Sequence, residues 1–330
     1  MQTRMRRRGD EAAFIVGVVP PAVSVIVVSH NTRRDLEACL VALGGEREVI
    51  VVDSNSADGS QELVRERFPH VRLLALAHNP GYGGAMNEGI AIASGDYLLL
   101  MNADARPLAH ATERLVERVE REPGIGIAGP RLLNPDGSLQ PSVRGFPTLW
   151  RLATEYFFLR RLAPRSRLLN AFYGAGFDHR SPRDAEFLVG AVLLVRRQTL
   201  DELGGFDPSF FMFNEEVDLC YRARKAGWRV VFVPDAEFVH LGGASTEQSW
   251  PRMYREQLRS HLRFLAKHAG AREAERARRL LAAAMVVRAV VFALTRRPER
   301  RRLSLAAAAW LRSGDADGLL RAATAAEAVP

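Results

Sequence analysis

The sequence of 330 residues is poor in cysteine and has no apolar run of the length that a bilayer-spanning helix needs. Its two cysteines, Cys39 and Cys220, have neither the spacing of a zinc site nor that of a redox pair, which favours buried thiols in a reducing compartment. Residues 1–13 are too polar and too rich in arginine for the apolar core of a secretory signal. We therefore expect residues 1–21 to form a basic, flexible arm.

A motif for binding nucleic acid is also missing, although the net charge is +8. Residues 246–330 hold 17 Lys and Arg against 8 Asp and Glu, a net charge of +9, which leaves −1 for residues 1–245. No aromatic or glycine-rich recognition motif is interleaved with these arginines, as the common RNA-binding modules require. The sequence therefore predicts no nucleic-acid partner and favours an anionic membrane surface.

Short apolar runs alternate with helical patterns in the first part of the chain. This alternation predicts an α/β fold with a mostly parallel central sheet, flanked by helices and built with right-handed crossovers. The predicted strands are residues 23–28, 48–52, 71–76, 97–101 and 125–128, and the predicted helices are residues 33–43, 60–68, 84–93 and 108–121.

The alternation stops between residues 130 and 186. An aromatic and arginine-rich stretch at residues 150–167 predicts a mobile or acceptor-facing insertion there. Regular structure resumes with predicted strands at residues 187–195, 229–233 and 236–240 and a predicted helix at residues 215–226.

Polar side chains follow several of the predicted strands. Open α/β sheets bind ligands beyond the carboxyl ends of their strands, so these side chains are candidates for a ligand site. An isolated carboxylate after a strand suits a hard divalent cation, although it is also typical of turns and helix caps. Asp53 is open in the same way between a structural role and accepting the ring N–H of a pyrimidine base. The strand-end candidates are His30, Asn31, Asp53, Asn102, Ala103 and Asp104.

Two further segments carry candidate chemistry. The loop at residues 79–89, with Asn79, Gly84 and Asn87, runs into a helix N-terminus whose free N–H groups suit a diphosphate, or is a plain glycine turn. Glu215 and Glu216 open a helix after three large apolar residues. Acidic residues favour helix N-termini, but carboxylates in apolar surroundings also make a general base with a raised pKa.

His240 ends the last predicted strand, where an imidazole completes a metal shell or is simply a polar strand end. The order of all these features along residues 22–246 resembles family 2 glycosyltransferases of the GT-A fold. Segments 131–140 and 190–218 are similar to the bacterial rhamnosyltransferase-like subgroup.

The resemblance implies a nucleoside-diphosphate sugar donor, Mg²⁺ or Mn²⁺, and transfer to an acceptor hydroxyl with inversion. It implies that Asp53 binds the nucleobase of the donor and that Asp104 and His240 bind the metal. It implies that Glu216 is the catalytic base, with Glu215 as the second choice. Donor binding then falls to His30, Asn31, Asn79, Gly84, Asn87, Asn102 and Ala103 together with Asp53 and Asp104.

Two residues depart from the commoner family pattern. Asn102 replaces the first Asp of the Asp-x-Asp motif, which removes one charge beside the metal, and Glu216 stands where Asp is more usual. The subgroup implies dTDP-rhamnose as donor, while thymine and uracil present the same N–H, so a UDP-sugar stays open. The implied acceptor is a saccharide or polyprenyl-linked saccharide in cell-surface polysaccharide synthesis.

Two other classes of protein compete with this interpretation. Sugar-phosphate nucleotidylyltransferases use a related fold, but their glycine-rich N-terminal signature is absent from residues 27–31. A non-catalytic membrane scaffold with a degenerate nucleotide-sugar pocket is the other alternative, and Asn102 is its best support.

Residues 247–330 are predicted to form a basic, helical C-terminal extension. Residues 280–294 are apolar except for Arg288, and this run is short for a spanning helix. It predicts an interfacial helix on an anionic leaflet, with packing on the catalytic domain or in an oligomer interface as alternatives. The expected location is the cytoplasm, peripheral to the inner face of the cell membrane.

Overall fold

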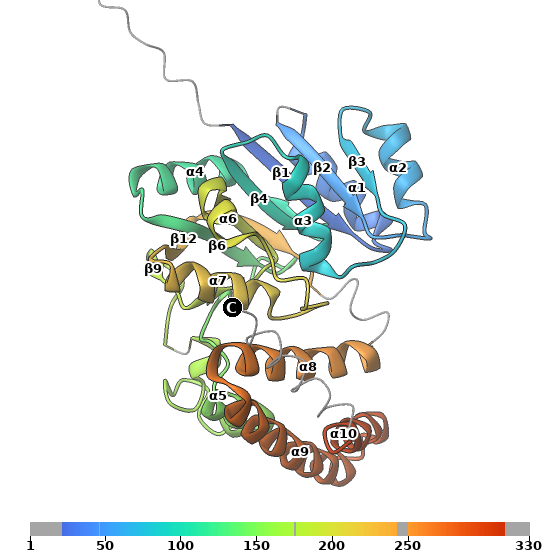
Figure 1. The fold of residues 1–330 in the computed structure, drawn as a ribbon, viewed down its shortest axis with the longest axis vertical. Coiled ribbons are helices and arrows are strands. Elements are labelled where there is room, and N and C mark those ends of the chain that lie inside the picture. Colours follow the sequence, from blue (N-terminus) through green and yellow to red (C-terminus); the bar gives the residue numbers. More distant parts are fainter. Residues whose placement is uncertain (1–21, 46, 175, 243–249, 314–330) are drawn as a thin grey trace, which may run out of the picture.

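The protein is described here from a computed structural model that covers residues 22–45, 47–174, 176–242 and 250–313 (Figure 1). The predicted arm at residues 1–21 lies outside the described residues, as does the predicted domain boundary at residue 246.

A parallel βα unit forms the first part of the sheet. Strands β1, β2, β3 and β4 all run parallel, with β1 between β2 and β4. These elements are β1 (Val23–Ser29), α1 (Arg33–Leu43), β2 (Glu48–Asp53), α2 (Ser60–Arg67), β3 (Arg72–Ala75), α3 (Tyr82–Ile92) and β4 (Tyr97–Asn102).

The sheet then continues in the order β3-β2-β1-β4-β11-β6-β12-β5. Strand β11 is antiparallel to both neighbours, β4 and β6, whereas β6 and β12 are parallel, so the predicted α/β fold is confirmed with a mixed sheet. The elements added here are β5 (Ala105–Pro107), α4 (Ala111–Arg121), β6 (Ile125–Leu133), β11 (Val192–Arg196), α6 (Arg197–Leu203), α7 (Glu215–Lys225) and β12 (Arg229–His240).

Strand ends depart from the sequence prediction in several places. Strand β6 runs to Leu133, beyond its predicted end at residue 128. The two strands predicted at residues 229–233 and 236–240 are one strand, β12, with an irregularity between Val233 and Glu237. The strand predicted at residues 187–195 is divided into β10 (Phe187–Leu188) and β11. Three other short strands are β7 (Leu139–Gln140), β8 (Val143–Arg144) and β9 (Arg183–Asp184).

Both faces of the sheet are covered by helices, so its strands are apolar on both sides. Successive side chains of a strand point to opposite faces, and Ile26 accordingly packs with α3 and α7, while Val25 and Val27 pack with α1, α2 and α4. Cys39 and Cys220 are buried thiols, as predicted, and they lie on opposite faces of the sheet. Burial raises the pKa of both thiols to about 12, so they are inert in this environment.

Four helices form a second layer below α7 (Figure 1). They are α5 (Leu149–Tyr156), α8 (Trp250–Ala269), α9 (Ala271–Leu294) and α10 (Pro298–Trp310), and α9 packs against each of the other three. The expectation of a mobile insertion is therefore wrong for α5, because its Leu152 and Tyr156 are 1% and 4% exposed. Their covering helix comes more than 100 residues later in the chain, which the local pattern did not indicate.

Candidate active site

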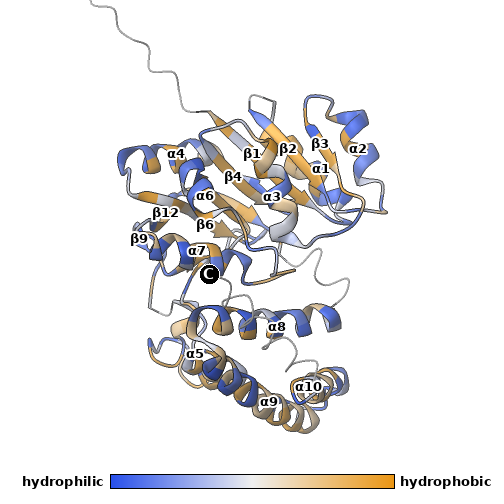
Figure 2. Ribbon diagram, in the orientation of Figure 1, coloured by the Kyte–Doolittle hydropathy of each residue, from blue (hydrophilic) through white to orange (hydrophobic). Residues whose placement is uncertain are grey.

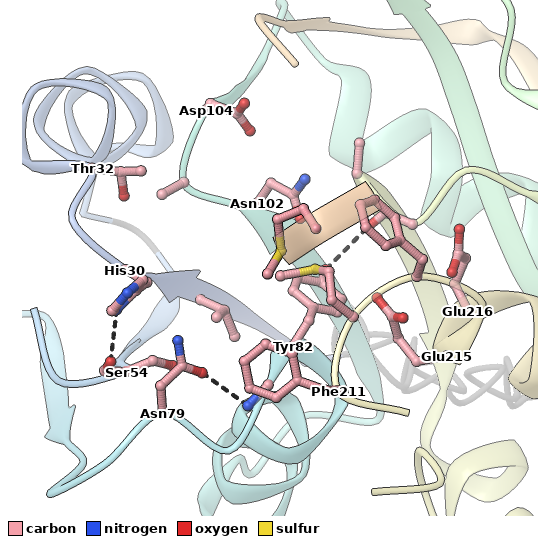
Figure 3. Close-up of a pocket in the computed structure, with 18 of the residues that line it drawn as sticks. His30, Thr32, Ser54, Asn79, Tyr82, Asn102, Asp104, Phe211, Glu215 and Glu216 are labelled. Atoms are coloured by element: carbon pink, nitrogen blue, oxygen red, sulfur yellow. Dashed lines mark hydrogen bonds between the residues drawn. The ribbon is translucent and has the colours of Figure 1, made fainter. Parts of the chain in front are cut away.

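The candidate site is a cavity of about 380 Å³ beyond the carboxyl ends of β1 and β4. In the sheet register, Ser29 pairs with Asp53 and Val28 pairs with Asn102, so the three parallel strands end at one edge. The predicted residues that line the cavity are His30, Asn31, Asn79, Asn102, Ala103, Asp104, Glu215, Glu216 and His240. Figure 3 shows Asp104 and the two glutamates on opposite sides of this cavity.

Asp104 and His240 form a buried pair on one side of the cavity. The carboxylate Oδ1 lies 3.3 Å from the ring Nε2, and both side chains are less than 10% exposed. Asp104 Oδ2 accepts a hydrogen bond of 3.1 Å from the backbone N–H of Gly242, and the Asn102 amide nitrogen lies 3.4 Å from the same His240 Nε2.

The orientation of the His240 ring is fixed by Gln140. The Gln140 amide nitrogen donates to Asn134 Oδ1 and to the His240 carbonyl, which turns its Oε1 to the ring Nδ1 at 2.7 Å. Nδ1 therefore carries the proton that it donates to Gln140, and Nε2 faces Asp104 with its lone pair. In this tautomer, Asp104 Oδ1 and His240 Nε2 are two acceptors that suit a shared cation. Metal-binding histidines are oriented in the same way, by a hydrogen bond to the other ring nitrogen.

Glu215 and Glu216 lie across the cavity at the first turn of α7. The carboxylate oxygen Oε2 of each is buried and has no hydrogen-bond partner among the described residues. Burial raises the pKa of Glu216, and burial together with the charge of Glu216 raises the pKa of Glu215. A carboxylate that lines a cavity, with a raised pKa and an unpaired oxygen, is suited to take a proton from a bound hydroxyl.

The family of the chain follows from its similarity to known proteins. A family model described as Glycosyl transferase family 2 matches residues 24–204, which contain β1, the Asn102–Asp104 turn and β11. The chain belongs to glycosyltransferase family 2. The glycosyltransferase is 33% identical, over 262 residues, to an N-acetylglucosaminyl-diphospho-decaprenol L-rhamnosyltransferase of Mycobacterium tuberculosis (strain ATCC 25618 / H37Rv); the match covers 74% of this chain and 85% of that relative.

A second relative supports the same subgroup. Rhamnosyltransferase WbbL of Escherichia coli (strain K12) is 24% identical, with 74% of this chain and 93% of that protein covered. The predicted likeness to the bacterial rhamnosyltransferase-like subgroup is confirmed by these two relatives.

Solved structures agree on the fold of the glycosyltransferase. The mannosyltransferase PcManGT from Pyrobaculum calidifontis, in complex with GDP-Man and Mn²⁺, has a TM-score of 0.52 at 17% identity and covers 90% of this chain and 89% of its own. GalNAc-T7 with UDP, GalNAc and Mn²⁺ has a TM-score of 0.53 at 16% identity, with 75% and 48% covered. The predicted GT-A fold is confirmed.

Three predicted donor-binding residues of the glycosyltransferase do not line the cavity. The Asn87 amide donates to the Phe206 carbonyl and accepts from the Phe206 N–H, at 2.8 Å each, so it fastens α3 to the loop before α7. Gly84 faces Pro80, where an added Cβ would come within 2.9 Å. In this structure both residues have packing roles, and their assignment to donor binding stays a prediction.

Asp53 is the third of these residues, and it is fully buried. Its Oδ1 accepts from the Ser56 N–H at 2.9 Å and from the Gln61 amide at 2.7 Å, which ties the loop after β2 to α2. Its Oδ2 is buried and has no hydrogen-bond partner among the described residues, so this oxygen is an unused acceptor. The assignment of Asp53 to the donor base stays a prediction.

The structure also adds residues that the motifs did not indicate. Tyr82 donates its hydroxyl to the Gly190 carbonyl at 2.9 Å and lines the cavity beside Phe211. Gly81, at φ +84°, lets the backbone pass so close to the Phe211 carbonyl that a Cβ would lie 2.1 Å from its oxygen. Arg252, on α8, lines the cavity and stacks over the Phe211 ring at 5.2 Å. Gly81 and Tyr82 lie in the loop at residues 79–89, which the sequence singled out without naming them, whereas nothing in the sequence pointed to Arg252.

Helix α8 holds the segment that carries the two glutamates. Ser260 Oγ donates to the Met212 carbonyl at 2.8 Å, and the His261 ring Nδ1 lies 3.0 Å from the Asn214 amide nitrogen. Asn214 sits at φ +65° directly before α7. Burial lowers the pKa of His261 to about 4, so the ring is neutral and accepts that amide proton.

A buried ionic network anchors the same helix pair. Asp218, on α7, is fully buried and lies 2.6 Å from the Arg222 guanidinium, 2.7 Å from Lys267 Nζ and 2.8 Å from the His268 ring. Burial by itself would raise the pKa of Asp218, but the hydrogen bond from His268 and the charges of Arg222 and Lys267 outweigh burial and lower the pKa to about 2.

Asp218→Asn should destabilise the glycosyltransferase by about 3 kcal/mol at neutral pH, because it leaves cations without their buried partner. Since the folded-state pKa of Asp218 is below its unfolded value, this stabilisation is fully present above about pH 4 and is lost as the pH falls toward 2. Urea unfolding of wild type and variant at pH 7 and pH 3 measures the difference, which should shrink at pH 3. The exposed Asp201→Asn is the control; equal effects of both variants would contradict the assignment.

Proposed function

We propose that this glycosyltransferase moves L-rhamnose from dTDP-rhamnose to a hydroxyl of a lipid-linked saccharide, with inversion, in cell-surface polysaccharide synthesis. The observation that carries the proposal is the pairing of two groups across one cavity: Asp104 with His240 on one side and Glu216 on the other. The rhamnosyl donor and the lipid-linked acceptor are supported by the 33% identical relative, which is an N-acetylglucosaminyl-diphospho-decaprenol L-rhamnosyltransferase.

Asp104 Oδ1 and His240 Nε2 would hold a Mg²⁺ or Mn²⁺ ion, which supplies Lewis-acid stabilisation of the departing diphosphate when bound. No group of three or more His, Cys, Asp or Glu that could hold a metal occurs among the described residues. Two protein ligands match a cation that takes its remaining ligands from substrate phosphates and water. Asn102 adds an amide in place of a charge, beside Nε2.

The base is proposed to be Glu216. Its Oε2 has no partner among the described residues, and an added Cβ on Gly190 would lie 3.0 Å from the Glu216 Cβ, so Glu216 packs closely against the backbone just before β11. The carboxylate takes the proton of the acceptor hydroxyl as the new glycosidic bond forms and the bond to the diphosphate breaks. One base and one displacement invert the anomeric carbon.

A panel of dTDP-, UDP- and GDP-sugars tests the donor. Each is incubated with a polyprenyl-diphosphate N-acetylglucosamine acceptor and Mn²⁺ or Mg²⁺, and free nucleoside diphosphate and glycosylated lipid are measured. Rhamnosyl product from dTDP-rhamnose alone is the expected result. Product from another sugar would replace rhamnose in the proposal, and donor binding without any product would favour the non-catalytic scaffold.

Arg252 is proposed to bind the donor diphosphate. Besides His30 and His240, it is the one basic side chain among the described residues that line the cavity. Charge-assisted hydrogen bonds to phosphate are among the stronger ones. Arg252→Ala should therefore raise KM for the donor about tenfold, with a smaller change in kcat. Steady-state kinetics and calorimetric binding of the nucleoside diphosphate measure this, with the exposed Arg255→Ala as control; an unchanged KM would refute the role.

A further inference from the structure

Helix α9 buries one face and exposes another. Its buried residues contact α5, α8 and α10, and they are Ala274, Ala277, Leu281, Ala282, Ala284, Met285, Ala289 and Phe292. No helix in the described parts of the chain is long and apolar enough to span a membrane. Any further contact of α9 is therefore made by its exposed face.

That face carries an apolar stripe in the C-terminal half of the helix, where Figure 2 shows hydrophobic colouring. Val290 is 55% exposed and Leu294 is 79% exposed, values at which large aliphatic side chains lie open to solvent. Intervals of three and four residues place the stripe along one side of the helix. The stripe consists of Ala283, Val286, Val287, Val290, Ala293 and Leu294.

Arg288 does not interrupt the stripe, although the sequence places it in the middle. Its guanidinium turns toward α5 and lies 4.4 Å from the centre of the Phe158 ring, 5.8 Å from Tyr156 and 5.6 Å from Phe292. The charge in the run of residues 280–294 is therefore held against aromatic rings inside the helical layer. The outward surface of this half of α9 is uncharged.

Arginines border the stripe at both ends. All of the following are exposed: Arg272, Arg276 and Arg279 before it, and Arg296, Arg297, Arg300, Arg301 and Arg302 after it. Within residues 271–313, the one fully exposed acidic residue is Glu299. An apolar stripe bordered by two clusters of positive charge is complementary to a surface with an apolar interior and an anionic boundary.

We propose that the stripe and its bordering arginines dock on an anionic lipid bilayer, with α9 lying in the plane of the interface. A second copy of the chain is the less suitable occupant, because a two-fold contact is self-complementary and would bring these arginine clusters against one another. The docking surface is independent of the sugar transfer proposed above: vesicle binding needs neither donor nor acceptor, so the two proposals fail separately.

Vesicle co-sedimentation of the full chain tests the docking surface. We expect binding to vesicles with 30 mol% phosphatidylglycerol, roughly the level at which anionic surface potential attracts basic segments, and little binding to phosphatidylcholine alone. Val290→Asp combined with Leu294→Asp should weaken binding about tenfold or more. Val41→Asp, at a site on α1 that is 64% exposed, is the matched control and should bind like wild type.

A second pair of variants separates charge from apolar contact. Arg297→Gln and Arg301→Gln should each weaken binding by about fivefold, and added salt should weaken it further. Transfer to a water-soluble acceptor should be unchanged in every variant, which shows that the fold is intact. Failure of wild type to bind anionic vesicles, or equal binding by the double Asp variant, would overturn the proposal. A smaller assembly in sedimentation velocity without any change in vesicle binding would assign the stripe to a second copy instead.

Discussion

Glu216→Gln should lower kcat by about 10²- to 10⁴-fold, the range that a positioned general base contributes. Glutamine keeps the size of the side chain but cannot take a proton, so the affinity for the donor nucleotide should stay within twofold of wild type, about 0.4 kcal/mol. Product formation in single turnover measures the chemical step, and calorimetry with the nucleoside diphosphate measures binding.

Glu215→Gln is the matched control for that variant, because it changes the neighbouring carboxylate of the same helix turn. Glu216→Asp should recover part of the activity, since it restores a base with a shorter reach. A larger loss in Glu215→Gln than in Glu216→Gln would transfer the role of base to Glu215.

The same carboxylate predicts the pH dependence of transfer. Burial raises the pKa of Glu216, so the ionised base should form only at a pH above the usual glutamic acid range near 4.3. The rate should rise with pH along this limb, and the limb should disappear from the residual activity of Glu216→Gln.

Asp104→Asn should lower kcat/KM by about a thousandfold, because several kcal/mol of charge stabilisation at the leaving diphosphate depend on this carboxylate. The amide removes the negative partner of His240 while keeping the side chain shape. Calorimetry should show that Mn²⁺ no longer strengthens binding of the nucleoside diphosphate.

Asp235→Asn is the control for that substitution, since Asp235 is exposed on the same strand as His240 but away from the cavity. Metal-dependent nucleotide binding that persists in Asp104→Asn would show that the cation is held elsewhere.

The strand-end part of the site was predictable from the sequence, because it follows from two local rules. Apolar runs give strands, and parallel neighbours end at one edge, so Asn102 and Asp104 meet His30 and Asn31 there without any knowledge of distant contacts. His240 was predictable on the same ground, since β12 ends beside the β4 turn.

The rest depends on partners that lie far apart in the chain. Asn87 has the sequence context of a phosphate loop, yet its amide is taken by Phe206, 119 residues later. Gln140 reaches the His240 ring because β7 lies against β6 beside His240. Arg252 reaches the cavity through the packing of α8 under α7. Local sequence patterns do not predict such contacts between residues that lie far apart in the chain.

The contacts that α8 makes with the segment before α7 affect the order in which the chain acquires activity. Every strand-end motif and both glutamates are synthesised before residue 241, but Ser260, His261, Lys267 and His268 follow later. A nascent chain that lacks α8 therefore contains the strand-end motifs and both glutamates, but not the residues of α8 that hold the segment around α7. We therefore expect competence for transfer only after α8 is synthesised, shortly before α9, whose exposed side is proposed to contact the lipid.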